Sequence, residues 1–199
     1  MQLSDFVLIS LLLSLLNVPV DCVDIKDTLE QAVRGNSLGA VISAVNAGAN
    51  INKVGGGGQT PLMAATLAGN VEIVKFLLQK GADPEIGEKQ GYTPMHGAAF
   101  QGRADVTRAL IQAQLNPSHM HEDGFRPIHR ACWGKEPRHT DTVGVLIEGG
   151  VKPTEVAKNG ETPLRLAEAA GNQGTIVLLQ EAIRKAAAED QRPITDDEI

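Results

Sequence analysis

A four-residue phrase with proline in second place recurs four times in this chain of 199 residues. The copies are Thr60-Pro61-Leu62-Met63, Thr93-Pro94-Met95-His96, Arg126-Pro127-Ile128-His129 and Thr162-Pro163-Leu164-Arg165. Their first positions, 60, 93, 126 and 162, are separated by steps of 33, 33 and 36 residues. A period of this length is typical of a chain that stacks copies of one small unit. An array of this kind, with no inserted catalytic segment, is suited to holding a partner.

The segment 60–92 shows what each unit contains. Pro61 suits the first position of a helix, where a missing N–H costs nothing, and Thr60 before it can cap the free N–H groups. Gly69 ends this short helix, because glycine readily takes the positive φ of a helix C-terminus. A second helix is expected from about Val71 to Lys80, where apolar residues follow helical spacing. The pattern predicts two antiparallel helices followed by a turn.

The phrase occurs together with Ala-Ala pairs and with triplets such as Gly48-Ala49-Asn50 and Gly81-Ala82-Asp83. In this combination the chain resembles ankyrin repeats over roughly residues 27–185. The resemblance implies an all-α solenoid of helix-turn-helix units with projecting β-turn fingers. It also implies a binding module that carries out no chemistry and needs no cofactor.

We expect three segments along the chain: a signal peptide at 1–22, an ankyrin-repeat domain at 23–190 and an acidic disordered tail at 191–199. The five repeats are placed at about 27–59, 60–92, 93–125, 126–161 and 162–190. Repeat one lacks Thr-Pro, but Leu29, Ala32, Leu38, Val41 and Val45 fit the same two-helix spacing. Terminal repeats are expected to differ, because one face of each meets water.

Repeat four carries three additional residues near Gly134–Thr140. Pro137 cannot continue a preceding helix, so we expect an enlarged loop between the two helices of this repeat. The loop is either a tolerated insertion or a functional element.

The N-terminal run Phe6–Leu16 is almost entirely apolar, and its length matches the hydrophobic core of a signal peptide. It is too short for a membrane span, so no stable span is expected after cleavage. Val20 and Cys22 fit the positions before a cleavage site, which places cleavage after Cys22. The segment lacks a basic residue before the run, which leaves an uncleaved anchor or an additional N-terminal helix as alternatives.

The chain carries 18 Lys and Arg residues against 24 Asp and Glu, a net charge of −6. No basic stripe is present, which argues against nucleic-acid binding and against attraction to anionic membranes. The last four residues, Asp196-Asp197-Glu198-Ile199, imperfectly resemble an ER-retrieval signal; the alternative is a plain acidic tail.

Four aromatic residues form two pairs that are spaced by one repeat: Tyr92 with Phe125, and Phe100 with Trp133. The first pair precedes the repeated phrase, and the second follows the two small residues of the first helix. The ankyrin resemblance implies that these positions are variable and face the concave groove. Because aromatic side chains are frequent interface hot spots, we predict a partner-binding patch on repeats three and four. The alternative is that one or two of the rings only pack against neighbouring helices.

The rest of the predicted patch is polar and surrounds these rings. It consists of Lys89, Gln90, Gln101, Glu122 and Asp123, with Lys158 at its edge.

No residue is predicted to be catalytic or to bind a metal. The ankyrin resemblance implies that His96 and His129 make structural hydrogen bonds between repeats. His119 and His121 could hold a metal ion, but no carboxylate or thiol at motif spacing completes the set. Cys132 matches Ala99 in the repeat and is expected to be a small core residue.

The predicted function is therefore non-enzymatic binding of a protein partner, of unknown identity, on the concave face. We expect a monomer that is secreted or lies in the lumen of the secretory pathway. The alternatives are a regulatory or chaperone-like subunit resident in the ER, an exported effector, and an enzyme with its activity on the repeat-four insertion.

Overall fold

The structure is a computed structural model that describes residues 25–88 and 91–190. Ten α-helices and no strands occur in these residues. The chain divides between Asn50 and Ile51 into two compact parts, which we describe separately. The predicted signal peptide, the predicted acidic tail, Lys89 and Gln90 lie outside the described residues.

The N-terminal part contains helices α2 (Ile25–Arg34) and α3 (Leu38–Asn46), which pack against each other. Ser37 caps α3, since its hydroxyl accepts a hydrogen bond from the backbone N–H of Ala40 at 3.4 Å. The buried apolar side chains of this pair are Leu29, Ala32, Val33, Val41 and Ala44. A two-helix unit is thus present although the Thr-Pro phrase is missing.

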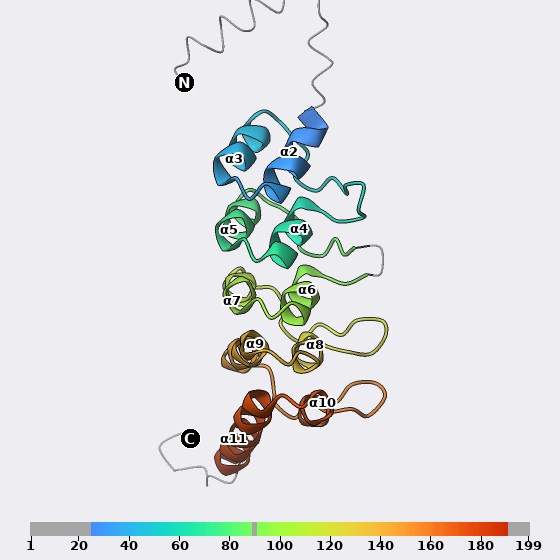
Figure 1. Ribbon diagram of the computed structural model, residues 1–199, viewed down its shortest axis with the longest axis vertical. Coiled ribbons are helices and arrows are strands. Elements are labelled where there is room, and N and C mark those ends of the chain that lie inside the picture. Colours follow the sequence, from blue (N-terminus) through green and yellow to red (C-terminus); the bar gives the residue numbers. More distant parts are fainter. Residues whose placement is uncertain (1–24, 89–90, 191–199) are drawn as a thin grey trace, which may run out of the picture. The chain divides into compact units, whose positions relative to one another are not determined.

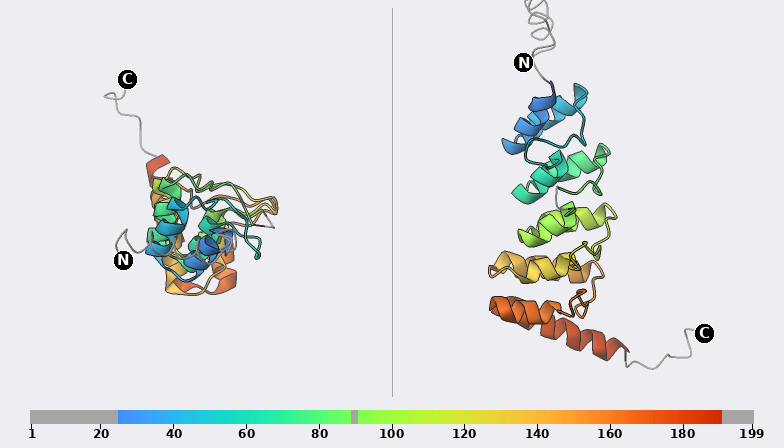
Figure 2. Two further views of the ribbon diagram at one scale, coloured as in Figure 1. Left: turned by 90° about the horizontal axis from the view of Figure 1, so that it is seen from above. Right: turned by 90° about the vertical axis from the view of Figure 1, so that its right-hand side faces the viewer.

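The C-terminal part is a stack of four helix pairs (Figure 1). The first helices of the pairs are α4 (Pro61–Ala68), α6 (Pro94–Phe100), α8 (Pro127–Cys132) and α10 (Pro163–Ala170). The second helices are α5 (Val71–Gln79), α7 (Ala104–Gln112), α9 (Pro137–Glu148) and α11 (Gln173–Asp190). Figure 2 shows the same pairs from two other directions, each lying against the next along the stack. This part is the all-α solenoid that the repeated phrase predicts.

The repeated phrase starts the first helix of each pair, as predicted. Its proline occupies an opening position of α4, α6, α8 and α10. The Thr60 hydroxyl accepts a hydrogen bond from the N–H of Met63 at 3.2 Å. Gly69 follows α4 with a φ of 84°, the left-handed conformation expected of a helix-ending glycine.

The loops between the pairs project from the column of first helices and end in tight turns (Figure 1). In the loop before α6, the N–H of Glu88 donates to the carbonyl of Tyr92 at 3.1 Å, and in the loop before α8 the N–H of His121 donates to that of Phe125 at 2.9 Å. These loops are the projecting fingers expected of the fold.

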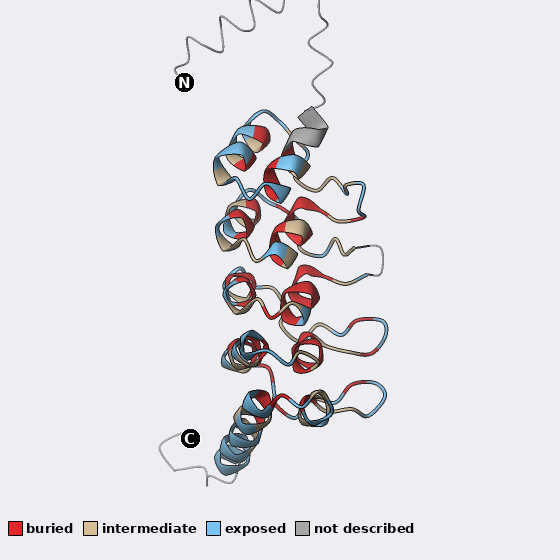
Figure 3. Cartoon of the chain, viewed as in Figure 1, coloured by how far each residue is buried: buried red, intermediate tan, exposed pale blue. Residues whose placement is uncertain are grey.

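The core of the C-terminal part runs along the stack between the two columns, and the first helices α4, α6 and α8 are the most completely buried (Figure 3). Small residues such as Ala98, Ala99, Ala131 and Cys132 lie fully buried there. Large aliphatic side chains, including Leu62, Leu110 and Leu146, are also fully buried. Each pair therefore buries its apolar face largely against the pairs beside it.

Side chains also tie the ends of α4, α6 and α8 to the following repeat. Arg103 Nε donates to the carbonyl of Leu67 at 3.1 Å, and Asn172 Nδ2 donates to that of Gly134 at 2.9 Å. One repeat after the first of these contacts and one before the second, His139 Nε2 lies 3.3 Å from the carbonyl of Phe100. These contacts satisfy helix-terminal carbonyls that have no partner within their own helix.

The prediction of an enlarged loop in repeat four is wrong. Helix α9 has 12 residues where α5 and α7 have 9 each, so the additional residues are helical. His139, inside α9, makes the contact to the preceding repeat that Arg103 makes just before α7. The extra turn is therefore at the start of α9. Pro137 begins this helix, because proline at an opening position is already in helical φ.

Helix α11 extends to Asp190 and is mostly exposed beyond its buried residues Thr175 and Leu179. Of the helices that the structure describes, none combines the length and apolar character needed to cross a membrane.

We predict that Leu110→Ala lowers the free energy of unfolding by about 2–5 kcal/mol, because it leaves a cavity in the stack. Leu110 is fully buried, whereas Val177 on α11 is 51% exposed. Val177→Ala is the matched control and should change stability by less than about 0.5 kcal/mol. Urea unfolding followed by circular dichroism measures both, and equal midpoints for Leu110→Ala and the unmodified chain would contradict the packing described here.

Candidate functional site

Arg130 on α8 lies at the centre of three of the four predicted aromatic residues. Its guanidinium carbon is 4.7 Å from the ring centroid of Tyr92, 5.2 Å from that of Phe125 and 4.4 Å from that of Trp133. The Arg130 side chain is only 8% exposed. Phe125 and Trp133 also contact each other edge to face, with centroids 5.1 Å apart. We call these four residues, together with Asp123, the Arg130 cluster.

The charge of Arg130 is matched within the cluster. Its guanidinium forms an ion pair with the Asp123 carboxylate, and its Nη2 donates to the Tyr92 hydroxyl at 2.8 Å. The same hydroxyl donates to Asp123 Oδ2 at 2.8 Å. Tyr92 comes from one finger, Asp123 from the next and Arg130 from a helix, so the cluster fixes two fingers to the helical stack.

These contacts shift the pKa values of both acids in the cluster. Burial alone would raise the pKa of the Asp123 carboxyl, but hydrogen bonds from His121, the Phe125 N–H, Tyr92 and Arg130 hold it well below its usual range. The pKa of the Tyr92 hydroxyl is raised, by burial first and by its hydrogen bond to Asp123 second. At neutral pH the cluster therefore contains a carboxylate, a guanidinium and a neutral phenol.

Two histidines lie beside Tyr92. The His121 ring stacks on the Tyr92 ring, with centroids 3.9 Å apart and planes 16° from parallel. His96 is buried in α6, with its Nδ1 2.9 Å from the Thr93 hydroxyl. Burial, followed by the neighbouring positive charges, lowers the pKa of His96 to about 4. His96 is therefore neutral at physiological pH.

His129 makes structural contacts, although they join parts of one predicted repeat and not two adjacent repeats. Its Nε2 lies 3.2 Å from the carbonyl of Glu155 in the next finger. Its Nδ1 accepts a hydrogen bond from the N–H of Arg126 at 3.3 Å. His129 thus links α8 to the finger that leads to α10, and both contacts lie within the predicted repeat 126–161.

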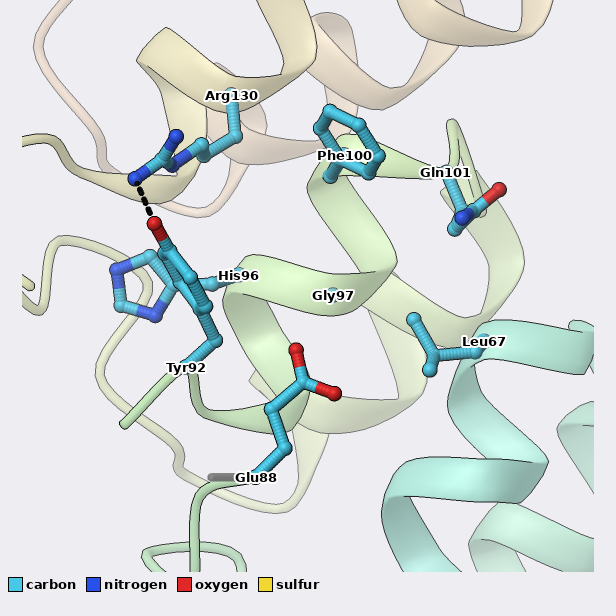
Figure 4. Close-up of a pocket in the computed structure, with 8 residues that line it drawn as sticks. All are labelled: Leu67, Glu88, Tyr92, His96, Gly97, Phe100, Gln101 and Arg130. Carbon is cyan, nitrogen blue, oxygen red and sulfur yellow. Dashed lines mark hydrogen bonds between the residues drawn. The ribbon is translucent and has the colours of Figure 1, made fainter. Parts of the chain in front are cut away.

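A hollow of about 330 Å³ opens beside the Arg130 cluster (Figure 4). We call it the Phe100 pocket, after its most exposed ring, which is 52% accessible. Its lining residues come from the finger before α6 and from the first helices α4, α6 and α8 or their ends. They are Leu67, Glu88, Tyr92, His96, Gly97, Phe100, Gln101 and Arg130.

The pocket owes its space to Gly97. The position equivalent to Gly97 is occupied by Ala64 in repeat two, by Arg130 in repeat four and by Leu166 in repeat five. In Figure 4, Gly97 lies in the middle of the lining side chains. A Cβ atom there would come within 3.0 Å of Leu67 Cδ2, so even a methyl group would reduce the space.

The predicted binding residues separate into four groups. Tyr92, Phe125, Trp133 and Asp123 come together in the Arg130 cluster, while Phe100 and Gln101 line the pocket. Glu122 is exposed in its finger. Lys89 and Gln90 lie outside the described residues. Tyr92, Phe125 and Trp133 are each half-buried, so they pack as well as face the surface.

The sequence reasoning missed Arg130, His121 and Glu88. Arg130 was the most detectable of them, because it lies three residues before Trp133, the residue that caps α8, and such spacing brings two side chains to one face. An arginine on the same face as an aromatic ring is a common source of a cation–π contact. The sequence gives no comparable signal for His121 or Glu88.

Cys132 is fully buried, and burial raises the pKa of its thiol to about 12. It is therefore a core residue, as its repeat position predicts. Within the described ranges, no group of three or more His, Cys, Asp and Glu side chains is arranged to hold a metal ion.

The stacked helix pairs, projecting fingers and exposed groove residues define a helical repeat protein of the kind that binds other proteins. Comparison with known families identifies it further: residues 29–121 match the family model for ankyrin repeats in three copies. No curated protein matches the chain. The chain is an ankyrin-repeat protein, and helices α8–α11 continue the same pattern beyond the matched residues. Ankyrin repeats are protein-interaction modules and are typically not enzymes.

We predict that Asp123→Asn lowers the free energy of unfolding by about 1–2 kcal/mol at pH 7, because the ion pair with Arg130 is lost. The depressed pKa of Asp123 stabilises the fold above the pKa of an unfolded aspartate, near 4, and this contribution is lost as the pH falls through the folded value. The difference between variant and unmodified chain should therefore shrink below about pH 4.

Urea unfolding at a series of pH values measures this dependence. Glu122→Gln, an exposed change in the same finger, is the control and should leave the curve unaltered. A stability difference that stays constant down to pH 2 would show that Asp123 does not act through its charge.

Proposed function

We propose that this chain binds a protein partner on its concave face, at repeats three and four. The observation that carries the proposal is Phe100, a large apolar side chain that is 52% exposed at the edge of a pocket. The pocket lies where the fingers meet the first helices, which is the concave side of an ankyrin array. Covering one such ring contributes about 1.5–3 kcal/mol to association.

The wall beside Phe100 is preformed, which favours binding. Tyr92 is held by hydrogen bonds to Asp123 and Arg130 and is stacked on His121. Because these side chains are already ordered, a partner that contacts them loses little conformational entropy on their account. We propose a monomer that acts by binding alone, without catalysis and without nucleic acid.

We further propose that the protein is secreted or lies in the lumen of the secretory pathway. The support is the apolar run Phe6–Leu16, followed by small enough residues before position 23. Residence in the ER, as a regulatory or chaperone-like subunit, is the second candidate, and it is favoured by the last four residues, Asp196–Ile199. Export as an effector is the third.

Affinity capture from the native source tests the binding proposal. The unmodified chain should recover a specific protein, and Phe100→Ala should reduce its affinity about 10–100-fold, since it removes one buried ring from the interface. Val177→Ala removes a similarly exposed apolar side chain from α11 and should recover the partner normally. Equal recovery by Phe100→Ala would show that the partner does not bind at this pocket.

Mass spectrometry of the N-terminus tests the proposed location. The protein isolated from its source should begin at Val23, after cleavage behind Cys22. If the isolated chain still contains residues 1–22, the proposal of a cleaved signal peptide is wrong. If deletion of Asp196–Ile199 moves the protein from cells into the medium, residence in the ER is supported over export.

A further inference from the structure

The Phe100 pocket has an apolar side and an acidic side. Leu67, the Phe100 ring and the bare backbone of Gly97 supply the apolar side. Glu88, from the preceding finger, brings a carboxylate to the opposite side (Figure 4). This combination suits a side chain that is apolar along its length and charged at its tip.

The residues that line the pocket include two charged side chains of opposite sign, Glu88 and Arg130. Arg130 is paired with Asp123, so the Glu88 carboxylate is the group that a ligand can pair with. Asp123 already matches Arg130, and His96 is neutral at pH 7. The Glu88 carboxylate accepts a hydrogen bond from the neutral amide of Gln59 at 3.3 Å. No ion pair to Glu88 is formed within the described part of the chain.

We infer that the pocket takes an arginine side chain of the bound protein, whose methylene stem lies along Leu67 and Phe100 and whose guanidinium pairs with Glu88. This inference rests on the proposed function, because it names the side chain by which a protein partner is anchored. An acidic side chain would be repelled by Glu88. A purely apolar one would cover the carboxylate without giving it a new partner, which is costly.

Arginine fits this site better than lysine. A planar guanidinium can form two parallel hydrogen bonds with a carboxylate and can also stack on an aromatic ring, whereas an ammonium group is a compact and strongly hydrated charge. The same chain already packs a guanidinium against aromatic rings, since Arg130 contacts Tyr92 and Trp133 in this way one repeat further on.

The test is an NMR titration of the ¹⁵N-labelled full-length chain with Nα-acetyl-arginine amide. Nα-acetyl-norleucine amide, which has an apolar side chain without charge, and Nα-acetyl-lysine amide serve as comparison probes. The arginine probe should shift the backbone signals of Gly97 and Gln101 in a saturable manner. The norleucine probe should bind about tenfold more weakly, the factor expected for one charge-assisted contact.

Two variants test the assignment of the two sides. Glu88→Gln should reduce affinity for the arginine probe to that for the norleucine probe. Glu85→Gln, an exposed change in the same finger and outside the pocket, is its matched control and should bind normally. Gly97→Leu should abolish binding of every probe by filling the pocket. The equivalent position of repeat five is Leu166, so the repeat can accept leucine there. Circular dichroism will show whether the variant folds.

Any of four results would overturn the inference: no saturable shift with the arginine probe, equal affinity for the norleucine probe, equal affinity for the lysine probe, or unchanged binding by Glu88→Gln. These outcomes are distinct from failure of the proposed function. If capture of a partner depends on Phe100 but the arginine probe does not bind, the proposed function stands and the arginine inference fails. If the arginine probe binds saturably but Phe100→Ala still captures the partner, the pocket binds arginine and the proposed partner site fails.

Discussion

The structure depends on one constraint: a pair of short helices cannot bury its apolar surface without a neighbour. The first helices have only six to eight residues, too few to be stable in isolation. Their proline and threonine starts fix where each helix begins, but packing between pairs supplies most of the stabilisation. The fingers and the groove are therefore positioned by a core that is continuous along the C-terminal part.

The Arg130 cluster extends this dependence to the surface. It joins Tyr92 from one finger, Asp123 from the next and a helix of repeat four through hydrogen bonds and ring contacts. In this surface the Arg130 guanidinium pairs with the Asp123 carboxylate and donates a hydrogen bond to the Tyr92 hydroxyl. The adjacent Phe100 ring lies outside this cluster and is exposed at the pocket edge.

Much of the fold was predictable, because the repeated phrase carries its own helix signals. Pro61 and Gly69 mark the two ends of a helix through properties of single residues, and their positions recur with the period. Pro137 shows the limit of that reasoning: proline both ends and begins helices, and only the contacts of His139 show that it begins one here. The period alone shows that the aromatic residues form two pairs one repeat apart. The contact of Tyr92, Phe125 and Trp133 with Arg130, and the space above Gly97, depend on side-chain directions that spacing does not give.

The position of Gly97 has a consequence for how such a surface can change. The same place in neighbouring repeats holds alanine, arginine or leucine, and none of these substitutions has prevented the helix pair from forming. The residue at this one position of each repeat therefore decides whether the groove has a hollow, a charged side chain or an apolar side chain at that level. The side chain at this one position can therefore differ from level to level of the array, while the apolar residues buried between the two columns continue to hold the stack together.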